Sequence, residues 1–224
     1  MADAELLISD DDAPPEVRVA IAHAPAELRG AVRTMLALDR QFASILATTS
    51  EPMLGQVRLA WWRDRLTEPL ETMPKGNPLL EAISATWGPS RVSLAPLADG
   101  WEALLVADDL DDATIFRFAE GREAAWSGLA GLARQGARTN AIRQAARVWA
   151  LGDLASNISD PDEKALVLSH AETLAQAALV LPRKLRPLAI LGSLARRSLA
   201  LGGAPLLGDR GAALTAFRVG IFGR

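Results

Sequence analysis

The sequence predicts an all-helical protein, and three observations lead to that prediction. The chain has 224 residues, of which 50% are hydrophobic but only 5% aromatic, with Ala and Leu dominating. Ala and Leu are strong helix formers, whereas sheets are enriched in β-branched and aromatic residues. Apolar residues recur at three- and four-residue steps between proline- and glycine-containing breaks. No alternating strand pattern and no glycine-rich phosphate loop stands out.

The breaks divide the chain into an acidic tail and a series of helical segments. Residues 1–15 are acidic and end in Pro14-Pro15, which predicts a flexible tail. Residues 16–224 are enough for one domain with a sizeable core. We expect these residues to form a bundle of about eight to nine helices. The helical pattern covers 16–24, 26–48, 52–70, 78–87, 92–107, 112–135, 138–159, 162–180, 184–201 and 209–221.

Composition excludes several classes of function. The chain has no Cys, so disulfides and thiolate metal sites are excluded. Its acidic start lacks the basic region and apolar run of a signal peptide. The chain has no stretch of about 18 uncharged apolar residues, the length that a membrane-spanning helix needs. We therefore expect a cytoplasmic protein, and we expect no nucleic-acid partner.

Charge is distributed unevenly along the chain. From Arg183 to Arg224 there are eight Lys or Arg residues against one acid, Asp209, so this end carries +7 and the rest −10. Such asymmetry can mark a surface for anionic lipid, such as that of the inner membrane, or for an acidic partner. The alternative is that these cations pair with acidic faces of the same fold.

The segment Arg29–Leu66, RGAVRTMLALDRQFASILATTSEPMLGQVRLAWWRDRL, carries the most specific pattern. It resembles the first helix pair of the squalene/phytoene synthase family. Its part Glu51–Leu66 is similar to a subgroup that includes the mitochondrial complex I assembly factor of synthase type and its bacterial relatives. The resemblance implies an isoprenoid-synthase-like bundle around a central cavity. It continues more weakly in Phe116–Trp126, Arg147–Asn157 and Leu181–Leu199.

Active members of this family join two prenyl diphosphates head to head. Ionising an allylic diphosphate releases a highly anionic leaving group, which Mg²⁺ must neutralise. Mg²⁺ prefers oxygen ligands, usually carboxylates together with phosphate and water. The family supplies them from two aspartate-rich motifs on facing helices, where positions i, i+1 and i+4 lie near one face.

In this chain the first motif has lost its carboxylates. The motif falls on Leu36–Ala47, where its arginine is kept as Arg40. The three metal-binding positions of the motif are Ala43, Ser44 and Ala47. The resemblance therefore implies no catalytic residue and no metal at these positions.

The second motif is interrupted. It corresponds to the region from Asp153 to Lys164, in which Pro161 predicts that the helix ends near Ser159 or Asp160. The ordered spacing of aspartates on one helical face is lost. Asp153 and Asp160 remain as fallback metal ligands, and no cofactor is expected unless an atypical site uses them with Mg²⁺.

A polar pocket could remain where the diphosphate site used to be. Arg58, Trp61, Trp62 and Arg65 fall on one side of their helix, with Arg40 opposite. The alternative is that the Trp pair packs in the core and the arginines pair with neighbouring acids such as Asp64 or Glu68. Trp126 and Trp149 are expected in the core. The candidate ligand-binding residues are Arg40, Arg58, Trp62 and Asn157.

The run Asp108-Asp109-Leu110-Asp111-Asp112 looks like a further metal motif. It precedes a predicted helix, and acids at a helix amino terminus are stabilised by capping and by the helix dipole. We interpret it as a capping segment.

Three functions remain open. The first is a family member that has lost prenyl transfer and acts as a lipid-handling or respiratory-complex assembly protein. The second is an active Mg²⁺-dependent transferase with a metal site drawn from Asp39, Asp153, Asp160 and Asp162. The third is a helical interaction module without a ligand, against which a large central cavity would argue.

Overall fold

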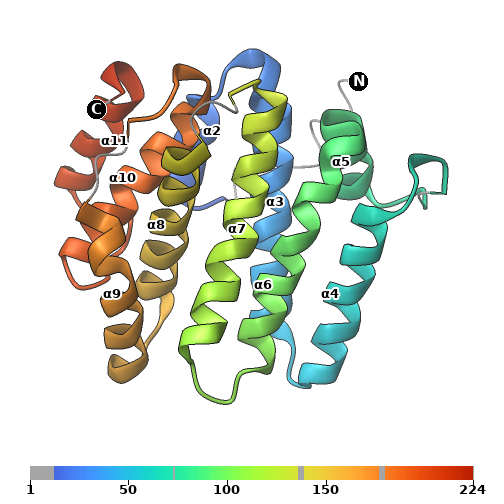
Figure 1. Cartoon of the computed structure of the whole chain (residues 1–224), viewed down its shortest axis with the longest axis horizontal. Helices are drawn as coiled ribbons and strands as arrows, with labels where there is room; N and C mark the ends of the chain where they lie inside the picture. The colour runs from blue at the N-terminus through green and yellow to red at the C-terminus, as the bar shows by residue number, and fades with distance from the viewer. Residues whose placement is uncertain (1–12, 73, 136–138, 177–179, 224) are drawn as a thin grey trace.

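The computed structural model describes residues 13–72, 74–135, 139–176 and 180–223. Within these ranges the chain forms helices and no strand, which confirms the all-helical prediction. Figure 1 shows the helices standing side by side, from α11 and α9 at one edge through α8, α7 and α6 to α4 at the other, with α3 behind. The α-helices are α2 (Pro15–Ala22), α3 (Ala26–Thr48), α4 (Pro52–Thr67), α5 (Pro78–Trp87), α6 (Ala95–Val106), α7 (Asp112–Leu132), α8 (Thr139–Asn157), α9 (Pro161–Gln176), α10 (Arg186–Ala200) and α11 (Arg210–Phe222).

Proline sets the start of four of these helices. Pro15, Pro52, Pro78 and Pro161 are the first residues of α2, α4, α5 and α9, a position where the missing N–H is not needed for an intrahelical bond. The boundary between tail and helix therefore falls at Pro15. Residues 1–12 of the expected tail lie outside the described residues.

Several predicted helix ends differ from those in the structure, and at one of them a proline is the cause. The helix expected over 52–70 ends at Thr67, because Pro69 holds Glu68 in an extended conformation with ψ 157°. A short 3₁₀ helix, η1 (Leu70–Thr72), follows it. The helix expected over 92–107 is preceded by the 3₁₀ helix η2 (Gly88–Leu94), and η4 (Arg183–Leu185) precedes α10. The expected end of 162–180 falls partly outside the described residues.

Aromatic side chains fill much of the core. Trp126 and Trp149 are buried with ring centroids 5.9 Å apart in an edge-on arrangement, which confirms their predicted place. Trp62 is also buried and meets Phe42 edge-on at 6.0 Å. The core prediction is wrong for Trp61, which is 38% exposed and lines a groove between α3 and α4.

Two glycines let helices of the core approach closely. A Cβ at Gly121 of α7 would lie 2.5 Å from the Pro96 carbonyl oxygen of α6. A Cβ at Gly152 of α8 would lie 2.5 Å from the Ala195 Cβ of α10. These contacts fix α7 against α6 and α8 against α10, and so place the inward faces of α7 and α8. Among the described residues, no helix combines the length and apolar character needed to cross a membrane.

Candidate ligand cavity

A cavity of about 530 Å³ lies between α2, α3, α6, α7 and α8, close to the start of α9. The predicted central cavity is therefore present. Its walls are mainly apolar, as is usual for small-molecule sites. Its apolar lining residues include Leu36, Leu46, Trp101, Leu104, Phe118, Trp149, Leu154 and Ile158.

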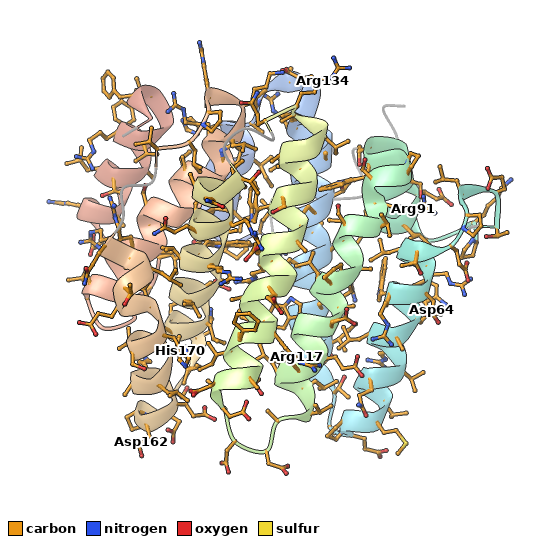
Figure 2. The ribbon with its side chains drawn as sticks, in the orientation of Figure 1. Asp64, Arg91, Arg117, Arg134, Asp162 and His170 are labelled. Carbon is orange, nitrogen blue, oxygen red and sulfur yellow. The ribbon has the colours of Figure 1, made fainter. Side chains whose placement is uncertain are left out.

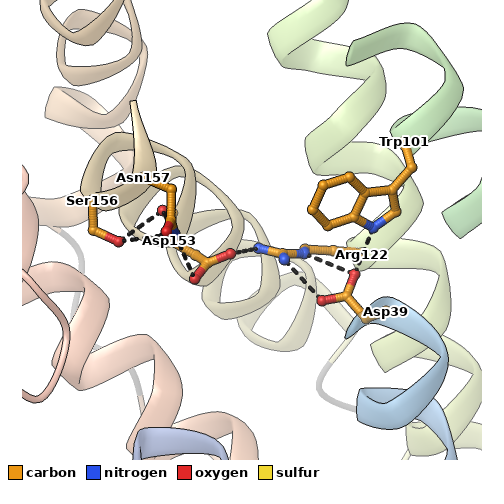
Figure 3. A network of polar contacts seen from close by, with 6 residues as sticks. All are labelled: Asp39, Trp101, Arg122, Asp153, Ser156 and Asn157. Carbon is orange, nitrogen blue, oxygen red and sulfur yellow. Dashed lines mark hydrogen bonds and ion pairs between the residues drawn. The ribbon is translucent and has the colours of Figure 1, made fainter. Parts of the chain in front are cut away.

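A buried ion-pair network crosses one wall of this cavity (Figure 3). Arg122 of α7 donates from Nε and Nη2 to the two carboxylate oxygens of Asp39 on α3, at 3.2 and 2.8 Å. Its Nη1 lies 2.7 Å from Oδ2 of Asp153 on α8, an ion pair without hydrogen-bond alignment. Trp101 of α6 donates its indole N–H to Asp39 Oδ1 at 2.9 Å. One guanidinium thus joins three helices and holds two carboxylates.

Aromatic rings enclose the Arg122 guanidinium. Its central carbon lies 4.2 Å from the ring centroid of Trp149, 4.6 Å from that of Phe118 and 5.5 Å from that of Trp101. The residue is only 3% exposed. Burial disfavours the charged form, but Asp39 and Asp153 outweigh it, so the pKa of Arg122 lies above its ordinary value. The cation stays charged and fixed in place.

Glu16 adds a further carboxyl group to the cavity wall. Burial, and to a smaller extent the charge of Asp153, raises the pKa of Glu16 above its ordinary value. Glu163 lies at the same cavity, and its Oε1 accepts a hydrogen bond of 3.2 Å from the backbone N–H of Leu110. The start of α9 is thereby tied to the loop between α6 and α7.

Of the three positions that the resemblance aligns with metal ligands, two face the cavity. Ala43 and Ala47 line it with methyl groups, whereas Ser44 lines a separate groove between α3 and α4. Arg40 and Asn157 line the cavity as well. Asn157 donates its side-chain N–H to the Asp153 backbone carbonyl at 2.8 Å, next to the ion-pair network in Figure 3.

The other two candidate ligand residues lie elsewhere. Arg58 and Trp62 line the α3/α4 groove together with Trp61, so Arg40 and Arg58 do not share one pocket. The expectation of a single polar pocket between these arginines is not met, because α4 with Arg58 packs on a different side of α3 from the side that carries Arg40 to the cavity. Arg65 pairs with Glu68 at 2.5 Å, as the alternative interpretation predicted.

The acids of the second motif are separated. α8 ends at Asn157 and Pro161 begins α9. Asp160 then accepts hydrogen bonds from the backbone N–H groups of Asp162 and Glu163, at 2.9 and 3.0 Å, as a helix cap. Asp162 is exposed in the first turn of α9, and His170 lies further along the same helix at the edge of the bundle (Figure 2). Of the fallback pair, only Asp153 lines the cavity.

The acidic run before α7 is a capping segment, as predicted. Asp111 accepts a hydrogen bond of 2.8 Å from the backbone N–H of Thr114. This bond and the helix start lower the pKa of Asp111 below its ordinary value. Over the described ranges, no group of three or more His, Asp or Glu side chains is arranged to hold a metal ion.

Sequence reasoning missed Arg122, the centre of the network. A signal for it exists in the sequence, because Phe118, Ala119, Ala125 and Trp126 flank it at three- and four-residue steps. Such spacing places a residue on the buried face of its helix. Asp39 carries the same signal, with Leu36 and Phe42 around it, and a buried cation and a buried anion are expected to find each other.

Comparison with known families gives one match. Residues 15–123 match the family model described as squalene/phytoene synthase. The matched part runs from the start of α2 into α7 and includes Asp39, Trp101 and Arg122. This region of the chain is therefore similar to the squalene/phytoene synthase family. No protein with curated annotation and no solved structure matched the chain.

Proposed function

We propose that this chain holds an isoprenoid-like lipid in its central cavity and has lost head-to-head prenyl transfer. The observation that carries the proposal is the pair of methyl groups, Ala43 and Ala47, at cavity positions where the family motif has metal-binding aspartates. An apolar wall at these positions favours a hydrocarbon chain over a metal-bound diphosphate. The cavity itself speaks against a helical module without a ligand.

The remaining carboxylates do not fit Mg²⁺. Both oxygens of Asp39 accept hydrogen bonds from Arg122, and one oxygen of Asp153 is paired with the same guanidinium. Mg²⁺ would have to displace this cation from a buried site, where an unpaired Arg122 would be costly. The network therefore supports a structural role for the two aspartates.

The charges around the cavity also disfavour a diphosphate. Four acidic side chains line the cavity against two basic ones, Arg40 and Arg122. Because Arg122 is already shared by two carboxylates, its charge is largely compensated. A ligand with several negative charges would meet net repulsion, whereas a neutral or cationic head group would not. The acidic lining residues are Glu16, Asp39, Asp153 and Glu163.

Loss of prenyl transfer is tested by a product assay. The purified chain is incubated with farnesyl or geranylgeranyl diphosphate, Mg²⁺ and NADPH, in parallel with an active synthase of the family. We expect no squalene or phytoene above the protein-free reaction, because the described residues hold no carboxylate cluster arranged to bind the metal. Product formation by this chain would instead support the alternative function, a transferase with an atypical site around Asp153.

A role in respiratory-complex assembly is the second candidate, favoured by one surface. α4, which carries the motif similar to the assembly-factor subgroup, exposes four large apolar side chains that suit a protein partner. They are Met53 at 73%, Leu54 at 52%, Val57 at 63% and Trp61 at 38%. Reduced amounts of assembled complex I in cells that lack this chain would support this role, and unchanged amounts would speak against it.

A further inference from the structure

The helix α11 exposes a second apolar face, at the opposite edge of the bundle from α4 (Figure 1). The helix packs on the bundle through small side chains, with Ala212, Ala216 and Val219 buried. Four larger apolar side chains point to solvent instead: Leu214 at 67%, Phe217 at 61%, Ile221 at 50% and Phe222 at 68% exposure. We call these four residues the α11 apolar face.

The α11 apolar face is a continuous stripe held in a fixed orientation. Leu214, Phe217 and Ile221 follow at three- and four-residue steps, so they share one side of the helix. A Cβ at Gly220 would contact the His23 ring, so α11 lies close against the end of α2. Contiguous exposed apolar side chains of this kind mark surfaces that bind a partner or a membrane.

All charges on this helix are positive. Arg210 and Arg218 are the charged residues of α11, and both are exposed. Neither forms an ion pair with the part of the chain that the structure describes. The acid before the helix, Asp209, is occupied, since it caps Ala212 at 2.8 Å and pairs with Arg197 at 3.0 Å. The alternative that the basic end pairs with its own fold holds for Arg197 and for Lys184, which lies 4.0 Å from Glu27, but not for α11.

We infer that α11 binds the surface of an anionic phospholipid bilayer, with its apolar face inserted among the lipids and Arg210 and Arg218 at the head groups. An apolar stripe flanked by arginines is the composition of helices that lie in the membrane interface. A second copy of this chain fits less well. Two such faces in a symmetric dimer would bring the arginines together without an acid to pair them.

The inference is tested with the full chain and lipid vesicles. Flotation is measured with vesicles of phosphatidylcholine alone and with vesicles containing phosphatidylglycerol. We expect binding to the anionic vesicles and loss of binding as salt is raised. The double variant Phe217→Ser/Ile221→Ser should lower the partition coefficient at least about tenfold, because it removes the inserted side chains. Arg218→Gln should lower it about fivefold on anionic vesicles only.

The matched control removes apolar side chains from the other exposed helix. Met53→Ser/Val57→Ser alters side chains that are 73% and 63% exposed on α4, and it should leave vesicle binding unchanged. Circular dichroism of each variant shows whether the fold is kept. Equal binding of the α11 variant and the parent chain would overturn the inference. The inference would also be overturned if the parent chain does not bind the vesicles and forms dimers through α11, or if it binds an acidic protein instead.

Discussion

Replacing Arg122 with methionine is expected to lower the free energy of unfolding by about 3–5 kcal/mol, the usual result of breaking a buried ion pair. Methionine removes the cation but keeps an unbranched apolar side chain at this position. Asp39 would then remain buried with only the Trp101 indole N–H, and Asp153 would lose its ion pair. For a chain of this size, this corresponds to a drop in the melting temperature on the order of 10 °C.

Urea unfolding followed by circular dichroism measures this effect. The control is Arg63→Met, which breaks ion pairs with Asp99 and Glu102 at 2.8 and 3.1 Å on the surface, where Arg63 is 38% exposed. That variant should cost at most about 1 kcal/mol. Adding Asp39→Asn and Asp153→Asn to Arg122→Met should recover part of the loss, since it removes the unpaired charges. A cost of Arg122→Met as small as that of the control would contradict the structural role of the network.

Replacing Ala43 with tryptophan is expected to reduce lipid binding at least about tenfold, a loss of at least ~1.4 kcal/mol of binding free energy. Ala43 is half-buried and its methyl group faces the cavity. An indole there would occupy space that a hydrocarbon chain needs. Binding of farnesol, followed by intrinsic tryptophan fluorescence, provides the measurement because Trp101 and Trp149 line the same cavity.

The next residue along the helix supplies the control for this variant. Ser44 is exposed and lines the α3/α4 groove instead of the cavity. Ser44→Trp introduces the same side chain on the same helix, and it should leave farnesol binding unchanged. If both variants bind farnesol as the parent does, the ligand does not occupy this cavity.

The helices and the cavity positions could be predicted because each depends on local sequence. Pro52, Pro78 and Pro161 each begin a helix, and this preference of proline for the first helical position does not depend on which helices pack together. Ala43 and Ala47 are four residues apart, so they share one side of their helix, and both line the cavity. The capping role of Asp111 depends only on the three residues that follow it.

The parts that could not be predicted depend on which helices become neighbours. Trp61 and Trp62 are adjacent in a pattern that suits a buried pair, but α4 is an edge helix, and only Trp62 is buried against the rest of the bundle. Arg58 was expected opposite Arg40, yet α4 meets the other side of α3. Arg122 lies 83 residues after Asp39 and 31 residues before Asp153, and the three belong to different helices, so their network exists only after packing.

One titration decides whether the cavity accepts a lipid without a diphosphate or binds a diphosphate through a metal ion. The full chain is titrated with farnesol and with farnesyl thiodiphosphate, the latter with and without Mg²⁺, and binding is followed by tryptophan fluorescence. We predict saturable binding of farnesol, and binding of the diphosphate analogue at least about tenfold weaker in both conditions. Tight binding of farnesyl thiodiphosphate that depends on Mg²⁺ would contradict the proposed function, because it would show a working metal site where Ala43 and Ala47 line the cavity.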